Sequence, residues 1–228
     1  MLPDIVLQTD FGLTTGFVAS MYGVIRMVDQ SLDVFDLNHE IRPFDMRQGS
    51  FLLRDTIPYW KGGTVFVSVV DPGVGTARRG CVAKLNNGSF VVTPDNGSLT
   101  AILDRVVAVR EIDESVNRLK GSDKANSFHG RDVFAYTAAR LASGIINFEG
   151  VGPEYPVNEI VTFETTHGTV APGRAEGEIA GCTKHFGGAG TNIDVDEFEK
   201  TGIVYGDMTH VTIVKNGETL FDRDVLYH

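Results

Sequence analysis

Long apolar runs, paired cysteines and an excess of basic residues are all absent from this sequence of 228 residues. No apolar segment approaches the ~20 residues of a membrane-spanning helix, so no membrane span is predicted. Cys81 and Cys182 are too few for a disulfide framework, and neither belongs to a Cys-x-x-Cys pair. The formal net charge of −10 disfavours nucleic acid as a partner, because neutralising phosphates requires clustered lysine and arginine.

Common catalytic and cofactor-binding motifs are missing as well. The sequence has no Gly-x-Ser-x-Gly elbow, no His-Glu-x-x-His, and no histidine pair at metal-ligand spacing. The first glycine loop, at Gly12, lacks the Gly-x-Gly-x-x-Gly pattern of dinucleotide sites. Neither a metal nor a cofactor is therefore expected. The N-terminus reaches an acid, Asp4, without a basic region, so a signal peptide is not expected and we predict a cytoplasmic protein.

The hydrophobic pattern divides the chain into two parts. Up to about Gly144, short apolar segments alternate with segments of helical spacing, which is typical of an α/β fold. We predict a mostly parallel sheet flanked by helices, a Rossmann-like layer. After Gly150 prolines appear and the helical periodicity fades, which indicates β structure. We therefore predict an α/β domain over 1–158 that carries the catalytic loop, and a small β-rich domain over 165–228.

Individual elements follow from the same pattern. In the first domain the predicted strands are 5–9, 32–37, 64–70, 81–85, 89–93 and 106–112, and the predicted helices are 16–28, 46–59, 99–103 and 132–143. In the second domain the predicted strands are 173–180, 203–205, 209–215 and 219–225. Asn87-Gly88 and Asn216-Gly217 each predict a hairpin, and Asn-Gly supplies the positive φ of a type I′ turn.

Carboxylates close two of the predicted strands. Asp71 follows the third strand and begins a glycine-containing loop that includes Arg78. One interpretation is a surface ion pair that holds a tight turn; the favoured one is a loop whose glycines let the backbone approach a ligand. Asp10 closes the first strand, where a turn-capping carboxylate and a carboxylate that binds a ribose diol are equally supported.

Other polar and aromatic residues also have two interpretations. A lone histidine is more often structural, but His129 completes, with Asp71 and Arg78, a set that can orient and deprotonate water. Asn96 either closes an Asp-Asn-Gly turn or presents its amide to a ligand. Phe186, in a glycine-rich loop of the second domain, either stacks on a flat ring or packs in a core.

Several short segments, taken in order, resemble one enzyme family, the S-adenosylmethionine hydroxide adenosyltransferases. These are adenosine-forming SAM hydrolases, related to the fluorinase and chlorinase enzymes. Each segment is weak alone, but the ordered set spans nearly the whole chain. The matching segments are Thr9-Asp10-Phe11-Gly12, Val69 to Thr76, Arg78-Arg79, Pro94-Asp95-Asn96-Gly97, Phe128-His129-Gly130-Arg131-Asp132, Phe186-Gly187 and Thr191-Asn192-Ile193.

The resemblance implies a large α/β domain, a smaller β-barrel-like domain, and a homotrimer with active sites between the large domain of one subunit and the small domain of its neighbour. It implies hydrolysis of S-adenosylmethionine to adenosine and methionine without a metal or cofactor. In that scheme Asp71, Arg78 and His129 orient and activate the water, and their presence favours water over halide as nucleophile. The substrate-binding residues it implies are Asp10, Phe44, Asn96, Phe128, Phe186 and Asn192.

Departures from the family pattern leave other functions open. Thr15 stands where the family often has an acid, and Thr183 or Lys184 and Gly188 stand where an Asp and an Asn are usual. The family also continues beyond the position of His228, so a shortened second domain and a divergent member are both interpretations. The alternatives are an adenosyl-binding protein without turnover, a halide-dependent adenosyl transferase, and an unrelated α/β hydrolase or nucleoside-binding enzyme.

Overall fold

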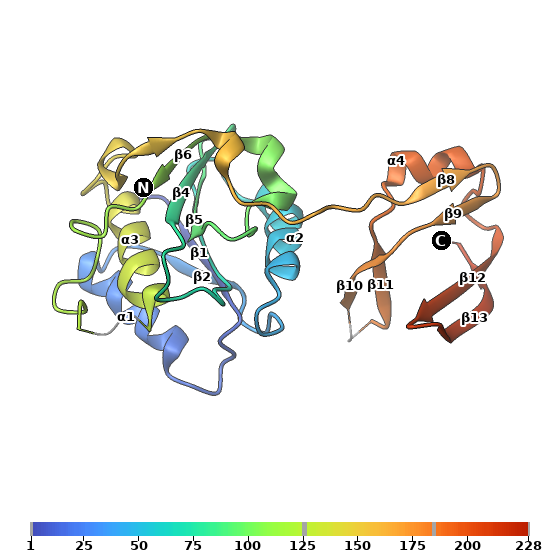
Figure 1. Cartoon of the computed structure of the whole chain (residues 1–228), viewed down its shortest axis with the longest axis horizontal. Coiled ribbons are helices and arrows are strands. Elements are labelled where there is room, and N and C mark those ends of the chain that lie inside the picture. Colours follow the sequence, from blue (N-terminus) through green and yellow to red (C-terminus); the bar gives the residue numbers. More distant parts are fainter. Residues whose placement is uncertain (1, 125–126, 184–185, 228) are drawn as a thin grey trace. The chain divides into compact units, whose positions relative to one another are not determined.

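The structure is a computed structural model that describes every residue except 1, 125, 126, 184, 185 and 228. The chain forms two compact units, Met1–Phe163 and Glu164–His228 (Figure 1). Among the helices of the described residues, none combines the length and the apolar character needed to cross a membrane.

The first unit is built around a seven-stranded sheet with the strand order β2-β1-β3-β5-β4-β6-β7. Its parallel pairs join β1 (Ile5–Thr9), β2 (Val34–Asn38), β3 (Val65–Val69) and β5 (Phe90–Pro94). Its antiparallel pairs add β4 (Gly80–Leu85), β6 (Val106–Glu111) and β7 (Glu154–Tyr155). The predicted α/β layer is confirmed, but the sheet is mixed rather than mostly parallel. The β4–β5 hairpin is one reason, because a tight turn can only join antiparallel strands.

Helices cover both faces of this sheet (Figure 1). One face packs against α1 (Phe17–Val28) and α3 (Tyr136–Ala142), and the other packs against α2 (Met46–Thr56). A π-helical segment, η3 (Gly130–Ala135), leads directly into α3. The short 3-10 turns of this unit are η1 (Ile57–Tyr59), η2 (Thr100–Arg105), η4 (Glu149–Val151) and η5 (Val157–Glu159).

Side chains of the central strands alternate between two hydrophobic cores. In β3, Val65, Val67 and Val69 belong to the core beneath α1 and α3, whereas Phe66 belongs to the core beneath α2. Strands that are buried on both faces read as continuous apolar runs, because side chains on both faces avoid water. This explains why the strand at 64–70 is visible in the sequence.

Within its described residues, the second unit contains three two-stranded antiparallel sheets. They pair β8 (Thr169–Ala171) with β9 (Arg174–Glu176), β10 (Ile179–Thr183) with β11 (Gly188–Thr191), and β12 (Met208–Lys215) with β13 (Glu218–Leu226). Between β11 and β12 lie α4 (Val195–Phe198) and η6 (Glu199–Thr201). The β-rich prediction is confirmed, but these described strands form separate pairs rather than a closed barrel.

The strand predicted at 203–205 is wrong. The Ile203 N–H donates to Thr201 Oγ1 at 3.0 Å, and the Val204 N–H donates to Asp207 Oδ2 at 2.9 Å. Local side chains therefore take the donors that a strand ladder would use.

Both Asn-Gly hairpins are present, but their turns differ. Asn216 and Gly217 have φ values of 53° and 80°, as a type I′ turn requires. In the β4–β5 turn, Gly88 has a φ of 84° whereas Asn87 keeps a negative φ, so the type I′ prediction is wrong there. The Asn87 side chain accepts the Ser89 N–H at 3.0 Å, which favours a turn closed by a single left-handed glycine.

Candidate active site

Three predicted site residues lie after the carboxyl ends of neighbouring parallel strands: Asp10 after β1, Asp71 after β3 and Asn96 after β5. The register pairs Thr9 with Val69, so Asp10 and Asp71 leave the sheet at the same edge. The connection from β1 runs through α1 on one face, and β3 is entered from α2 on the other. This edge is the topological switch point, where α/β sheets bind their ligands.

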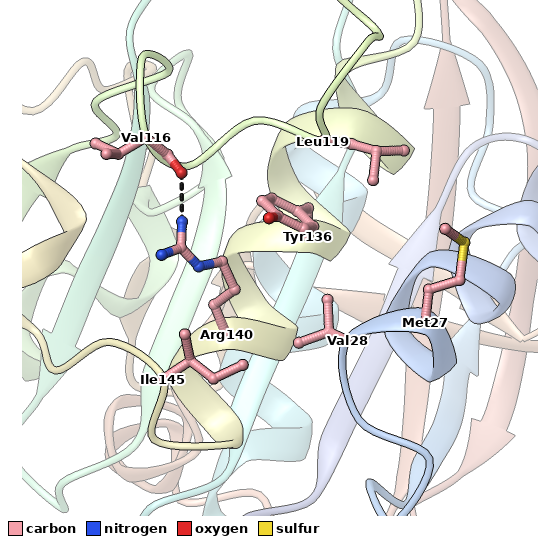
Figure 2. A pocket seen from close by; sticks show the side chains of 7 residues that line it. All are labelled: Met27, Val28, Val116, Leu119, Tyr136, Arg140 and Ile145. Atoms are coloured by element: carbon pink, nitrogen blue, oxygen red, sulfur yellow. Dashed lines mark hydrogen bonds between the residues drawn. The ribbon is translucent and has the colours of Figure 1, made fainter.

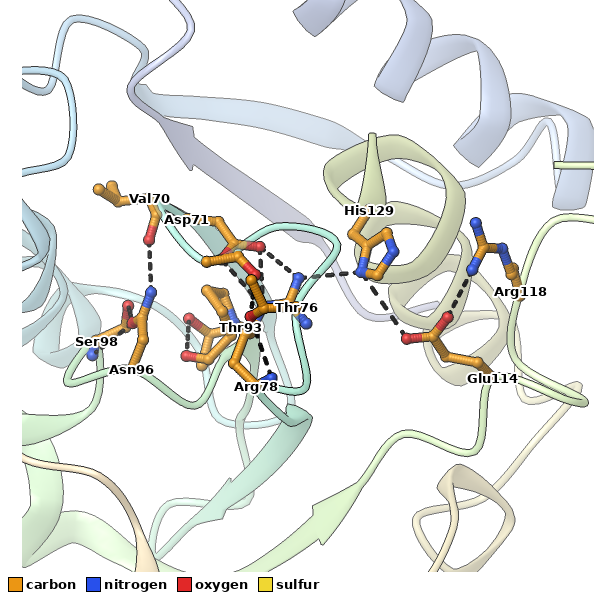
Figure 3. A network of polar contacts seen from close by, with 12 residues as sticks. Val70, Asp71, Thr76, Arg78, Thr93, Asn96, Ser98, Glu114, Arg118 and His129 are labelled. Atoms are coloured by element: carbon orange, nitrogen blue, oxygen red, sulfur yellow. Dashed lines mark hydrogen bonds and ion pairs between the residues drawn. The ribbon is translucent and has the colours of Figure 1, made fainter. Parts of the chain in front are cut away.

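Asp71, Arg78 and His129 form a continuous chain of polar contacts (Figure 3). Arg78 Nε lies 3.0 Å from Asp71 Oδ1 and 3.1 Å from Oδ2, and Arg78 Nη2 also binds Asp71 Oδ2. The same Nη2 lies 3.0 Å from His129 Nδ1. The exposed fractions of the side chains are 5% for Asp71, 9% for Arg78 and 6% for His129. The structure thus brings these predicted residues together in a site shielded from water.

Arg78 fixes the tautomer of His129. A guanidinium group only donates hydrogen bonds, so His129 Nδ1 accepts and the ring proton resides on Nε2. Burial lowers the pKa of His129 below its usual 6.5; Glu114 and Asp71 raise it, and Arg78 and Arg118 lower it. The imidazole is therefore neutral at pH 7, with its basic lone pair on Nδ1.

The other ring nitrogen of His129 also has a distinctive setting. Nε2 is buried and has no hydrogen-bond partner among the described residues. An unpaired buried donor is unfavourable by about 1–3 kcal/mol. The site is therefore suited to a polar ligand that accepts this N–H.

Sequence reasoning missed two charged residues of this network. Glu114 and Arg118 lie in the turn after β6, where Glu114 Oε2 binds Arg118 Nη1 at 2.8 Å. Glu114 Oε1 lies 3.8 Å from His129 Nδ1 (Figure 3). The available signal was a Glu and an Arg four residues apart, but that spacing is also common in exposed helical pairs. Nothing in the sequence linked the pair to His129.

Asp10 is in direct contact with the segment that carries Phe44. Asp10 Oδ2 accepts the backbone N–H of Phe44 at 2.9 Å. Phe44 has a φ of 64°, which is rare for a bulky residue, and the residue is 65% exposed. Burial raises the pKa of Asp10, the Phe44 N–H opposes that rise, and the charge of Asp71 adds to it. Asp10 therefore holds the backbone of Phe44 at the same edge as Asp71.

His39, a buried histidine that the sequence did not place in the site, stabilises the turn that carries Asp10. His39 Nδ1 lies 2.8 Å from Thr9 Oγ1, and His39 Nε2 lies 2.8 Å from Asp36 Oδ1. The carbonyl oxygen of His39 accepts the Gly12 N–H at 2.8 Å. His39 thus holds residues on both sides of Asp10.

The amide of Asn96 is engaged within the protein. Its Nδ2 donates to the carbonyl oxygen of Val70 at 2.9 Å, and its Oδ1 accepts from Ser98 Oγ at 2.7 Å (Figure 3). These bonds hold the chain immediately before Asp71. Direct contact between Asn96 and a substrate stays a prediction.

Phe128 belongs to an aromatic cluster beside His129. Its ring packs edge-on against Phe11 and Phe17, with centroid distances of 5.7 Å and 5.2 Å. The Arg131 guanidinium lies 4.8 Å from its centroid. A Cβ at Gly130 would lie 3.0 Å from Phe11 Cζ, so glycine allows this close packing.

The predicted site residues of the second unit have different settings. Phe186 is 90% exposed as a whole residue. Asn192 Oδ1 accepts the Glu178 N–H at 2.7 Å, and its Nδ2 donates to the Thr166 carbonyl at 2.9 Å, so its amide ties two segments of this unit together. Participation of Phe186 and Asn192 in the site around Asp71 stays a prediction.

The positions that depart from the family pattern lie on the surface or outside the described residues. Thr15 is exposed, and Gly188 begins β11. Lys184 and the side chain of Thr183 lie outside the described part of the chain.

A cavity of about 440 Å³ lies elsewhere in the first unit (Figure 2). Its lining residues are Met27, Val28, Val116, Leu119, Tyr136, Arg140 and Ile145, none of which is a predicted site residue. Arg140, the charged member, binds the Val116 carbonyl and lies 2.9 Å from Asn117 Oδ1. The cavity is mainly apolar, and its charged group is occupied in holding a loop.

The fold and the site define an α/β protein whose buried Asp-Arg-His chain lies at the switch point of a mixed sheet. Residues 5–152 match the family described as SAM hydroxide adenosyltransferase N-terminal domain, and the chain belongs to this family. The resemblance found in the ordered motifs is thereby confirmed.

Known proteins support this assignment. An (R)-S-adenosyl-L-methionine hydrolase of Salinispora arenicola is 44% identical over 146 residues, which are 62% of this chain and 54% of that protein. A fluorinase of Actinoplanes sp. is 27% identical over an alignment of 243 positions, gaps included, that covers 96% of this chain and 80% of the fluorinase. The crystal structure of an uncharacterized conserved protein from Thermotoga maritima matches with a TM-score of 0.87 and 32% identity, covering 98% of this chain and 83% of that one. The matched part spans about half the length of the Salinispora hydrolase.

Proposed function

We propose that this protein hydrolyses S-adenosyl-L-methionine to adenosine and L-methionine by attack of water on the 5′ carbon. The observation that carries the proposal is the buried chain Asp71–Arg78–His129, which joins an acid bound by a guanidinium group to a neutral imidazole. The similarity to a protein named (R)-S-adenosyl-L-methionine hydrolase gives independent support.

The reaction requires alignment and one proton transfer. As the bond between the water oxygen and C5′ forms, the C5′–S bond breaks and sulfur keeps the electron pair as the thioether of methionine. The sulfonium is already a good leaving group, so the site must hold the water in line with that bond and remove its proton. Asp71 accepts a hydrogen bond from the water, and His129 takes its proton at Nδ1. Arg78 holds both oxygens of Asp71 in place and yields Nδ1 to the water.

In this proposal the remaining predicted residues bind the substrate or hold the edge of the site. Asp10 accepts hydrogen bonds from the ribose hydroxyls, and Phe44 and Phe128 cover the nucleoside. Phe186 and Asn192 of the second unit complete the pocket, and Asn96 holds the edge that carries Asp71. The scheme uses neither a metal nor a cofactor.

We also propose that the protein acts in the cytoplasm as a homotrimer, with each site between the large domain of one subunit and the small domain of its neighbour. The exposed Phe186 ring supports a role for the second unit at such an interface. Sedimentation of the purified protein tests the assembly, and a monomer at every concentration that turns over substrate would contradict it.

Halide-dependent adenosyl transfer is the second candidate, because the fluorinase similarity extends over 96% of this chain. The buried Asp71 carboxylate opposes it, since a halide placed beside it would be repelled.

Products formed from S-adenosyl-L-methionine in isotopically labelled water distinguish these functions. Mass spectrometry should find adenosine labelled at its 5′ oxygen together with free methionine. A halogenated nucleoside in the presence of chloride would favour the second candidate. Folded protein that yields no nucleoside product would contradict both and favour an adenosyl-binding protein.

A further inference from the structure

We propose that Glu114 is a positioning residue for His129: it accepts the hydrogen bond of the protonated ring and connects that buried ring to solvent. The inference rests on the proposed hydrolysis, in which His129 takes a proton from water.

Two groups of opposite charge converge on the same atom of His129. Arg78 Nη2 lies 3.0 Å from Nδ1 and donates to it, whereas Glu114 Oε1 lies 3.8 Å from Nδ1. A carboxylate has no hydrogen to donate to the Nδ1 lone pair, which explains its longer distance in the neutral state. Protonation of Nδ1 makes Glu114 the favoured partner in place of Arg78, because the new N–H repels the guanidinium and attracts the carboxylate. Once the ring has gained the proton from water, Nδ1 thus binds Glu114 rather than returning to Arg78.

The carboxylate is held in the orientation that this exchange needs. Arg118 Nη1 binds Glu114 Oε2 at 2.8 Å and leaves Oε1 directed toward His129 (Figure 3). Arg118 is itself anchored, since its Nη2 donates to the Ser122 carbonyl at 3.2 Å. Glu114 therefore needs little reorganisation to accept the Nδ1–H.

The partly exposed side chain of Glu114 connects the buried His129 ring to solvent. The His129 side chain is 6% exposed, whereas the Glu114 side chain is 35% exposed. A proton left on the buried ring after each turnover must leave before the next, and Glu114 is a partly solvated acceptor beside the ring.

The charges around His129 determine in which direction its pKa should change when Glu114 is replaced. Asp71 and Arg78 face the ring from the loop after β3, and Glu114 and Arg118 face it from the turn after β6. The negative charge of Glu114 raises the pKa of His129, and the positive charge of Arg118 lowers it. Removing the Glu114 charge leaves Arg118 unopposed, so the ring should become harder to protonate.

The experiment compares the wild type with Glu114→Gln and Glu114→Asp, and with Glu149→Gln at an exposed glutamate of η4 as the matched control. The kcat and KM for S-adenosyl-L-methionine are measured against pH, and the imidazole of His129 is titrated by NMR without substrate. Glu114→Gln should lower kcat roughly tenfold, below the range for loss of a general base itself, with little change in KM. It should also lower the pKa of His129 in the NMR titration. Glu114→Asp should recover part of the kcat and part of the pKa of His129, and Glu149→Gln should match the wild type in both quantities.

The outcomes distinguish a failure of the proposed hydrolysis from a failure of the proposed role of Glu114. Wild-type protein that forms no adenosine contradicts the proposed function, and the NMR titration then still tests whether Glu114 controls the charge of His129. An unchanged His129 titration in folded Glu114→Gln overturns the inference, as does an unchanged kcat when the wild type is active. If Glu114→Gln does not fold, Arg118→Gln gives a test of opposite sign: it should raise the pKa of His129, and no rise would overturn the inference.

Discussion

The side-chain amide of Asn96 donates to the carbonyl oxygen of Val70 at 2.9 Å, one residue before the Asp71 carboxylate. This bond joins the ends of β5 and β3 at the edge where the site lies. Asn96 is therefore expected to position Asp71, whatever contact it makes with substrate.

Replacing Asn96 with alanine tests this role. We expect the free energy of unfolding to fall by about 1–3 kcal/mol, because the Val70 carbonyl loses its partner. The kcat should fall more than KM rises, since Asp71 would be less well aligned. Urea unfolding and steady-state kinetics measure the two effects. Asn158→Ala at an exposed position is the matched control, and a variant that behaves like this control would exclude the positioning role.

Arg78 is expected to be irreplaceable by lysine. Its guanidinium binds both oxygens of Asp71 and also reaches His129, which a single ammonium group cannot reproduce. Arg78→Lys should lower kcat roughly 100-fold or more, as the loss of oriented acid–base groups does in other enzymes. Arg174→Lys, at a side chain that is 76% exposed, is the matched control. Activity near the wild-type level in Arg78→Lys would show that charge alone suffices at this position.

The lowered pKa of His129 predicts how activity and stability depend on pH. The neutral ring is the active form, so kcat/KM, which reports the free enzyme, should fall on the acid side with a midpoint below the usual 6.5. The unfolded chain takes up the proton near pH 6.5, before the folded protein does. The contribution of His129 to stability is therefore fully present above that pH and is lost as the pH falls toward the lowered folded value.

His129→Gln isolates this contribution, because the other titrating groups stay in place. Between pH 7 and the lowered pKa of His129, the wild type should lose more unfolding free energy than the variant. If the unfolding free energies of the two proteins change in parallel with pH, the pKa of His129 in the folded protein is not lowered.

Regular patterns explain which parts of the fold were predictable from the sequence. The continuous apolar run of β3 and the three- and four-residue spacing of the buried residues in α1 are local properties, and both elements are found. The separate sheets of the second unit depend on pairings that local composition does not specify. At 203–205, apolar residues indicated a strand, but the backbone N–H groups of Ile203 and Val204 donate to the side chains of Thr201 and Asp207 instead of to a neighbouring strand.

The site shows the same division between local and long-range information. Acids at strand ends marked the correct edge of the sheet, because parallel strands end together. Spacing did not decide which arginine meets Asp71: Arg78 binds it, whereas Arg79 pairs with Asp95 at 3.2 Å. Glu114 approaches His129 only through the packing of the turn after β6 against η3, so no local motif contains the pair.

His39 gives a prediction for substrate binding rather than for chemistry. The Asp36–His39–Thr9 contacts and the bond from Gly12 to the His39 carbonyl hold the turn that carries Asp10. His39→Ala should raise KM for S-adenosyl-L-methionine more than it lowers kcat, because Asp10 is proposed to bind the ribose and takes no part in the proton transfer. The carbonyl bond survives this change, so the fold should persist with a loss of about 1–3 kcal/mol. His210→Ala, at an exposed histidine of the second unit, is the control. A fall in kcat at unchanged KM would place His39 in the chemical step and contradict its assignment to the support of Asp10.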